Sequence, residues 1–363
     1  MKKIVSLLGV AIAIGFSSCN DINSFVMEEH QGAFILNKGT DKSSVSHYSY
    51  EREAVTNNYF QARSIGMNAG AHTIATRKGT DYPKGKAFIV YPAANEIAMV
   101  NLEGYTAEGT IEGYTKPTDI LLANEDVAFI SATGADGKGM VYEYNLKSKK
   151  QLNAFEVAKD PLKMIASGKH LYCASKGDGT GAKVIAIDMT NGVKVDTIAL
   201  PYDNPIDMVV DIDRNVWVYC AGSVNGLIKI TKYEMITLDA NLDSERDTLI
   251  FSNRPEEFLL GDHLNDSANP LSISNDGRLL YYVYGSLCSN TVYAEGNVSK
   301  ESIVAGDYQK EAFSGIDYDS RTNRIMALTS SGKLVILKDK GEVWNDDEVY
   351  DVGVNPIMSA FNY

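Results

Sequence analysis

The stretch "NPIDMVVDIDRNVWVYC", residues 204–220, contains the unit that decides the fold. A short apolar run after Pro205 leads into a polar segment, and a second apolar run follows from Val216 to Cys220. Each run is four to six residues long and rich in Val and Ile, which favours strands over helices. The stretch therefore predicts two strands joined by a tight turn.

The polar segment between the two runs has a second interpretation. Asp211, Asp213 and Asn215 have the D-x-D-x-N spacing that opens a calcium-binding loop. Such a loop also needs Gly at its sixth position and Glu at its twelfth, where this sequence has Val216 and Gly222. We therefore interpret the segment as a hairpin turn, because Asp and Asn side chains hydrogen-bond to nearby backbone.

Units of this kind recur along the chain. Their apolar starts lie at Ala71, Pro117, Pro161, Pro205, Pro270, Phe313 and Pro356. The spacings are 46, 44, 44, 65, 43 and 43 residues, and each start leads through a polar turn into a second apolar run. Helical periodicity is weak throughout, so the pattern predicts an all-β chain. A period of this length is typical of four-stranded propeller blades.

The two ends of the repeat region complement each other. The last unit, residues 355–363, has room for one strand only, whereas "GAFILNKG", residues 32–39, has the pattern of a second strand without a first. A C-terminal strand that completes the N-terminal blade would close the ring and remove free sheet edges. We predict a seven-bladed β-propeller closed in this way. The insertion between Lys232 and Pro270 is expected to lengthen the outer strands and exit loop of its blade.

The first residues have the pattern of an export signal. Two lysines precede an apolar run that is too short to span a membrane. Phe16-Ser17-Ser18-Cys19 resembles the lipobox of bacterial lipoproteins, which implies cleavage before Cys19 and its lipidation; an ordinary signal peptide is the alternative. We predict a lipoprotein signal peptide at 1–18, a lipid-anchored tether at 19–31 and the propeller at 32–363. The formal net charge of −13 argues against nucleic-acid partners.

The lipobox-like start, the "GAFILNKG" strand, the Pro-x-Asp-Ile and Pro-x-Asp-Met starts and the "VGVNP" ending have a family resemblance. Together they resemble the YncE-like seven-bladed β-propeller surface lipoproteins of Bacteroidota, which include the BtuG cobalamin-capturing proteins. The resemblance implies an outer-membrane, cell-surface lipoprotein. Such a protein would bind a small nutrient, a cobalamin-like corrinoid or a comparable ligand, and deliver it to a TonB-dependent outer-membrane transporter.

Two other functions remain open on this scaffold: a lactonase-like propeller hydrolase and a non-catalytic protein or glycan interaction scaffold. A lactonase would hold a metal with inner-strand carboxylates, and Asp119 and Asp207 have suitable positions, with Lys163 between them. A neighbouring lysine disfavours a divalent cation, so structural hydrogen bonding is the preferred interpretation. No G-x-S-x-G or P-loop motif occurs, and we assign no catalytic residue, metal or cofactor. Cys173, Cys220 and Cys288 are interpreted as buried apolar residues.

Ligands of propellers usually contact the loops that enter the inner strands and the loops that join second and third strands. Tyrosines on these loops could form an amphipathic binding face, although 21 tyrosines occur along the chain and ordinary packing is the alternative. His72 is added because it falls on an inner strand near the channel. The predicted ligand-binding residues are His72, Tyr91, Tyr114, Lys116, Tyr202, Asp203, Asn204, Tyr308 and Tyr350.

Overall fold

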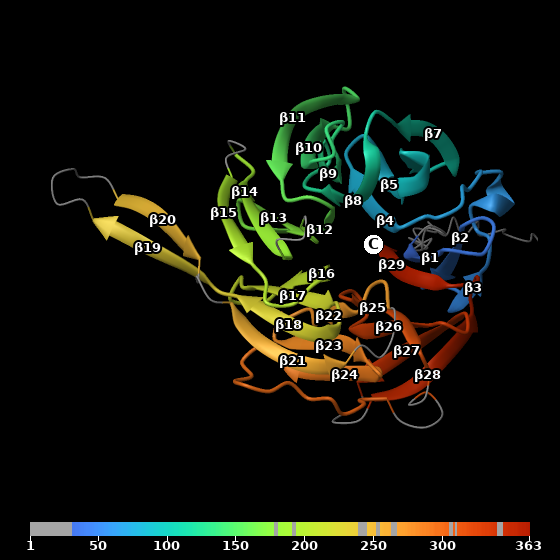
Figure 1. Cartoon of the computed structure of the whole chain (residues 1–363). Helices are drawn as coiled ribbons and strands as arrows, with labels where there is room; N and C mark the ends of the chain where they lie inside the picture. The colour runs from blue at the N-terminus through green and yellow to red at the C-terminus, as the bar shows by residue number, and fades with distance from the viewer. Residues whose placement is uncertain are drawn as a thin grey trace, which may run out of the picture.

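The chain folds into seven antiparallel blades arranged in a ring, which is a β-propeller (Figure 1). A computed structural model describes residues 31–177, 181–190, 194–238, 245–251, 255–262, 267–304, 308, 311–339 and 344–363. Within these ranges the helical elements are two short 3-10 turns, η1 (Gln61–Arg63) and η2 (Pro92–Ala94). The predicted fold class is confirmed.

The strands of each blade are given from the innermost to the outermost. Blade 1 contains β29 (Pro356–Asn362), β1 (Gly32–Asn37), β2 (Ser44–Ser49) and β3 (Ala54–Thr56). Blade 2 contains β4 (Thr73–Gly79), β5 (Tyr82–Tyr91), β6 (Glu96–Asn101) and β7 (Thr106–Ile111). Blade 3 contains β8 (Thr115–Leu122), β9 (Val127–Thr133), β10 (Gly139–Asn145) and β11 (Lys150–Val157). Blade 4 contains β12 (Pro161–Ser167), β13 (His170–Ser175), β14 (Lys183–Asp188) and β15 (Lys194–Ala199).

The remaining three blades follow the same order. Blade 5 contains β16 (Pro205–Val210), β17 (Val216–Ala221), β18 (Val224–Ile230) and β21 (Glu256–Asp262). Blade 6 contains β22 (Leu271–Ile273), β23 (Leu279–Tyr284) and β24 (Ser286–Thr291). Blade 7 contains β25 (Phe313–Asp319), β26 (Arg324–Thr329), β27 (Lys333–Asp339) and β28 (Trp344–Asp351). Inner strands begin at, or within two residues of, the starts predicted from the repeat.

The ring is closed by pairing of the two chain ends. The last strand, β29, pairs antiparallel with β1, so that Phe34 faces Ala360 and Ile35 faces Ser359. This confirms the prediction that the C-terminal strand completes the N-terminal blade. The pairing hides the backbone edge that β1 would otherwise expose.

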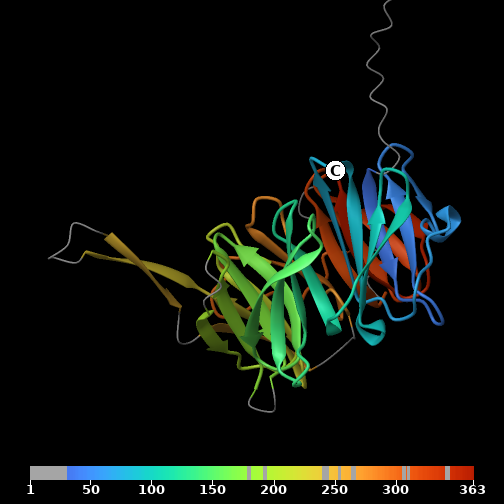
Figure 2. The ribbon, with the colours of Figure 1, turned by 90° about the horizontal axis from the view of Figure 1, so that it is seen from above.

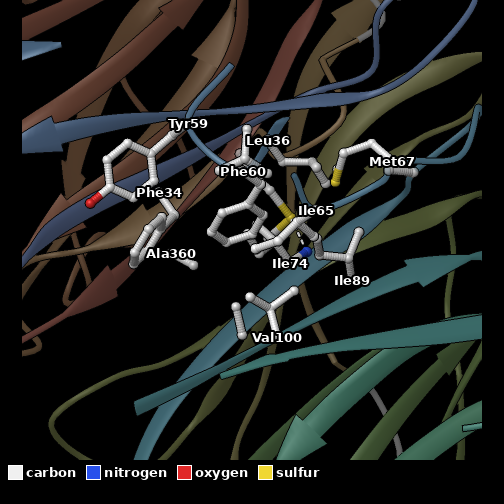
Figure 3. Close-up of a cluster of buried hydrophobic side chains, with 14 of the residues drawn as sticks. Phe34, Leu36, Tyr59, Phe60, Ile65, Met67, Ile74, Ile89, Val100 and Ala360 are labelled. Atoms are coloured by element: carbon white, nitrogen blue, oxygen red, sulfur yellow. Dashed lines mark hydrogen bonds between the residues drawn. The ribbon is translucent and has the colours of Figure 1, made fainter. Parts of the chain in front are cut away.

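Both faces of each blade are buried against its neighbours. Successive side chains of a strand point to opposite faces, and in β17 this sends Val216 and Val218 toward blade 4 but Trp217 and Tyr219 toward blade 6. This is why the run "VWVYC" is apolar without alternation. Seven apolar clusters fill the seven junctions between blades. Figure 3 shows the cluster between blades 1 and 2, with Phe60 near its middle and Phe34 beside Tyr59 and Ala360.

The insertion after Lys232 differs from its prediction. Strands β19 (Lys232–Leu238) and β20 (Glu245–Phe251) pair only with each other and form a separate hairpin that projects from blade 5 (Figures 1 and 2). The outer position of the blade is taken by β21, which pairs with β18. The insertion therefore adds an arm and does not lengthen the outer strands, because the chain leaves the sheet before β21 returns to it.

The turn at Asp211 is confirmed as a structural turn. One carboxylate oxygen, Oδ1, accepts the backbone N–H groups of Asp213 (3.0 Å) and Asn215 (2.8 Å). The other, Oδ2, accepts Asn215 Nδ2 and Trp217 Nε1, both at 2.9 Å. Four donors thus converge on one buried carboxylate, which fixes the hairpin and anchors the indole of the next strand.

Candidate functional site

A cavity of about 250 Å³ lies where the inner strands begin. Its walls come from residues at or near the starts of β4, β8, β12, β16 and β29, from the segment before β22, from the end of β17 and from the turn after β13. The end of β17 and the turn after β13 lie where second strands lead into third strands, so the cavity opens on the face at which ligand binding was predicted. The ring brings together residues that are up to 286 positions apart, from His72 to Met358.

The cavity wall has a polar and an apolar part. Lys163, Asp119, His72 and Asn204 contribute charged or hydrogen-bonding groups. The apolar part is formed by Leu162, Ile206, Ala221, Ala268, Ile357 and Met358. An apolar wall with a few convergent polar groups is the usual composition of small-molecule sites.

Lys163 is the centre of a charged cluster formed with Asp119, Asp207 and Asp317. Its Nζ lies 3.9 Å from Asp207 Oδ1, and the Asp207 side chain is almost completely buried. Burial alone would lower the pKa of Lys163, but the carboxylates of Asp207, Asp119 and Asp317 raise it above its ordinary value. The ammonium is therefore charged at every physiological pH.

Two carboxyl groups of this cluster titrate near neutral pH. Burial raises the pKa of Asp207 to about 7, even though Lys163 and the backbone N–H groups of Leu271 and Met208 act in the opposite direction. Burial likewise raises the pKa of Asp317 to about 6, against the Ser359 N–H and Lys163. A buried carboxylate costs free energy unless opposite charge and donors compensate it, and here the compensation is incomplete.

The same carboxylates also join neighbouring blades. Asp119 Oδ2 accepts the N–H of Met164 at 2.8 Å, which connects blade 3 to blade 4. Asp207 Oδ2 accepts the N–H of Leu271 at 3.1 Å, which connects blade 5 to blade 6. The structural role predicted for Asp119 and Asp207 is confirmed by these bonds.

Two of the predicted ligand-binding residues line the cavity. Part of the His72 side chain is exposed to solvent in the cavity. The protein atoms around the imidazole displace water from it, and this loss of hydration lowers its pKa. The charge of Asp119 raises this pKa, and the charge of Lys163 lowers it. The imidazole is therefore neutral at pH 7. Asn204 has a left-handed backbone (φ 55°), and its Nδ2 donates to Ala221 O at 2.8 Å. Its Oδ1 is buried without a hydrogen-bond partner among the described residues.

The predicted tyrosine face is not formed by Tyr91 and Tyr114, and this part of the prediction is wrong. Tyr91 is 1% exposed in the cluster between blades 1 and 2, where its hydroxyl donates to Met67 Sδ. Tyr114 is 5% exposed and packs on Tyr142, with ring centroids 4.7 Å apart. Both rings fill blade junctions because their apolar area stabilises the packed state more than exposure at a loop would.

The other predicted residues lie outside the cavity wall. Tyr202 is half-buried and packs on the apolar cluster between blades 4 and 5. Tyr308 packs on the apolar cluster between blades 6 and 7. Tyr350 lies in the outer strand β28, not on an entering loop, and its hydroxyl donates to Glu53 O. Lys116 is exposed at the start of β8, and Asp203 is exposed on the loop before β16. Cys19 lies outside the described residues.

Sequence analysis missed several cavity residues, and one of them had a signal. Asn269 precedes Pro270 as Asn204 precedes Pro205, and both asparagines line the cavity. An Asn-Pro pair at the start of an inner strand is therefore a partial signal, because the third pair, Asn355-Pro356, does not line the cavity. Lys176 and Ser267 have no comparable signal, because a loop residue's position relative to the channel depends on the curvature of the ring. Asp317, which belongs to the charged cluster around Lys163, was also missed, because it lies four residues after the predicted start at Phe313, whereas Asp119 and Asp207 lie two residues after theirs.

The geometry defines the protein as a seven-bladed β-propeller with a central cavity lined by both polar and apolar side chains. No known protein family and no curated protein match the sequence. The chain is similar in structure to a quinonprotein alcohol dehydrogenase-like protein from Bacteroides thetaiotaomicron, with 13% identity, a TM-score of 0.58 and coverage of 92% of this chain and 79% of that one.

Two further solved structures have the same likeness. Hydrazine synthase of Kuenenia stuttgartiensis is 12% identical, with a TM-score of 0.53 and coverage of 85% of this chain and 95% of that one. A functionally unknown protein from Desulfotomaculum acetoxidans is 11% identical, with a TM-score of 0.53 and coverage of 89% of this chain and 99% of that one. Identities this low establish the β-propeller fold alone. In the described ranges no helix is long and apolar enough to cross a membrane.

Proposed function

We propose that this protein is a cell-surface binding propeller that captures a small nutrient in its central cavity and delivers it to a TonB-dependent outer-membrane transporter. The observation that carries the proposal is the cavity itself, which is lined by polar groups of several blades together with apolar side chains. A rigid ring holds these groups in place, so a ligand would bind without loss of much chain freedom.

The cavity volume limits the ligand. Pockets that enclose drug-sized molecules measure roughly 300–1,000 Å³, and this cavity measures about 250 Å³. A molecule of about ten non-hydrogen atoms would fill it, given that a cavity of about 150 Å³ accommodates benzene. A corrinoid could insert only a side chain and would rest its ring on the rim.

The contacts of the carboxylates favour binding over lactone hydrolysis. A lactonase-like site would use inner-strand carboxylates as metal ligands, whereas Asp119 and Asp207 accept backbone N–H groups of the next blade. Lys163 also places a positive charge beside them, which opposes a divalent cation. Asp119 and Asp207 therefore act as part of the scaffold.

Isothermal titration tests the binding proposal. Small nutrients, cyanocobalamin and cobinamide would be titrated into the wild-type protein and into Ala268→Trp, which places an indole at the cavity wall. Ala135→Trp, on an exposed turn between β9 and β10, is the matched control. We expect Ala268→Trp to abolish binding of the small ligand and the control to retain it. Equal affinity in all three proteins would contradict a ligand site in the cavity. If only the corrinoids bind, the ligand site would be reassigned from the cavity to its rim.

Anchoring and delivery are tested in cells. Cys19→Ala should release the protein from the membrane fraction if Cys19 carries lipid, and protease added to intact cells should digest the wild-type protein if it faces outward. A protein that stays membrane-bound without Cys19, or that resists protease until cells are broken, would contradict surface anchoring. Copurification of a TonB-dependent transporter with the wild-type protein is the expected evidence of delivery.

A further inference from the structure

We propose that the ligand of the central cavity is a small organic anion, a carboxylate with a short apolar portion, whose charged oxygens bind Lys163. This inference rests on the proposed binding function and specifies its ligand class. It follows from the placement of Lys163, from the positive charge around the cavity and from the polar atoms left without partners in its wall.

Lys163 has hydrogen-bonding capacity to spare. The ion pair recorded for its ammonium among the described residues is the 3.9 Å contact to Asp207 Oδ1, which is longer than a hydrogen bond. Asp119, Asp207 and Asp317 each already accept a backbone N–H. Lys163 lines the cavity with 26% of its side chain exposed, so its three N–H donors can reach a ligand oxygen.

Three lysines lie at or near this face although the protein as a whole is acidic. Lys163, Lys38 and Lys176 all lower the pKa of His72, which places them within electrostatic reach of the cavity wall. Lys176 itself lines the cavity and is exposed, and Lys38 is exposed on the loop between β1 and β2. Asp119 acts in the opposite direction and has the largest charge effect on His72. In a chain of net charge −13, three lysines at one concave site still favour the approach of anions there.

Two further groups complete the polar side of the site. Ser267 is 6% exposed, lines the cavity and has a hydroxyl without a hydrogen-bond partner in the described part of the chain. Asn204 Oδ1 lacks a partner in the same way. The Ser267 hydroxyl can donate to the second oxygen of a carboxylate. Asn204 Oδ1 is an acceptor, so its missing bond needs a donor such as a hydroxyl group on another part of the ligand.

The apolar side of the cavity selects the rest of the ligand. Leu162, Ile206, Ile357 and Met358 also line the cavity and carry no charge. A hydrocarbon or aromatic portion would bury apolar surface there, whereas a bare inorganic ion would leave the wall in contact with water. The site therefore fits an organic acid better than phosphate or sulfate.

The test compares each acid with its neutral amide of the same shape. Phenylacetate, pentanoate and succinate would be titrated alongside phenylacetamide, pentanamide and succinamide, with inorganic phosphate as an ion without an apolar portion. We expect at least one acid to bind about tenfold or more tightly than its amide, as charge-assisted hydrogen bonds require. Tighter binding of an amide, or of phosphate alone, would overturn the anion inference and leave the binding function standing.

Variants test whether Lys163 is the residue that binds the carboxylate of the ligand. Lys163→Met should weaken acid binding at least tenfold, Lys163→Arg should retain part of it, and Lys176→Met should weaken it less. Lys147→Met, which removes an exposed lysine paired with Asp81 on a β10–β11 turn, is the control and should have no effect. If Lys163→Met fails to fold, the acid and amide comparison and Lys176→Met still decide. Unchanged affinity in both cavity variants would overturn the proposal.

Proton uptake provides a readout that a merely structural lysine would not change. An anion on Lys163 competes with Asp207 and Asp317 for the same ammonium, so their carboxyl groups should take up protons when it binds. The other titratable groups around the Lys163 ammonium and the cavity wall are Asp119, His72, Lys176 and Lys38. Titration in two buffers of different ionisation enthalpy should show net proton uptake at pH 7. Binding without proton uptake would contradict contact with Lys163.

Discussion

Lys163 and Asp207 lie on the inner strands of adjacent blades, and their charged groups approach to 3.9 Å in the centre of the ring. The pair connects blades 4 and 5, whereas hydrogen bonds from Thr118 to Pro161 O and from Ser314 to Pro356 O connect other neighbours. The central polar groups therefore do two things at once. They hold the blades in register and they form the wall of the cavity.

Stability should fall as the pH rises from about 4 to about 7. Asp207 has a pKa of about 7 in the folded protein against about 3.9 in an unfolded chain, so the folded state binds more protons in this window. Stability contributed by the protonated group is complete below pH 4 and is lost as pH passes through 7. Urea denaturation at several pH values measures the free energy of unfolding, and Asp207→Asn should make this free energy depend less on pH.

The control for this prediction is Asp213→Asn, in an exposed turn, which should leave the pH dependence as in the wild type. Asn at position 207 can still accept the Leu271 N–H through its amide oxygen. If Asp207→Asn has the same pH dependence as the wild type, another group is responsible, and Asp317, with a pKa of about 6, is the next to replace.

Tyr114→Ala should reduce stability rather than ligand affinity. The side chain is 5% exposed and packs between blades 2 and 3, so its removal should cost about 3–5 kcal/mol in the free energy of unfolding. Tyr114→Phe keeps the ring and should be close to neutral. Denaturant unfolding combined with ligand titration separates the two effects. Weaker binding by a variant of unchanged stability would restore Tyr114 to the ligand site.

Gly226→Ala should be destabilising because of Tyr202. A Cβ at position 226 would lie 2.3 Å from two ring carbons of Tyr202, and such overpacking costs about 1–3 kcal/mol. In Gly226→Ala/Tyr202→Ala the clash is removed, so the double variant should be more stable than the sum of the single effects predicts. Gly66→Ala, with nothing within 4 Å of the new Cβ, is the control. Additive effects would exclude the clash.

Ser359→Pro should open the ring. The Ser359 N–H donates to Asp317 Oδ2 at 2.6 Å, and the residue faces Ile35 in the closing pair of strands. Proline removes the N–H and leaves the buried carboxylate of Asp317 with one donor fewer. We therefore expect the variant to aggregate or to unfold without a cooperative transition. Ser359→Ala keeps the N–H and should fold. A stable, monomeric Ser359→Pro protein would show that closure does not depend on this bond.

Much of the architecture was predictable because it repeats. The 43–46-residue period, the turn at Asp211 and the unpaired strands at both ends predicted seven blades and their closure, and strand periodicity is a local property of the sequence. The insertion after Lys232 was located correctly but assigned the wrong structure. Apolar strands look alike whether they extend a blade or form a separate hairpin, so pairing partners cannot be read from local pattern.

The site was predictable only in part. His72 and Asn204 reached the cavity, whereas Tyr91 and Tyr114 turned into blade junctions. A tyrosine beside an inner strand can point along the channel or sideways, and one residue of register decides between them.

The sequence by itself determined the blades, because alternation and turn chemistry act over a few residues. Only the tertiary structure decided that Lys163 lies beside Asp207 and Asp317. Closing the ring removes these groups from water, and their titration near neutral pH is a consequence of that burial.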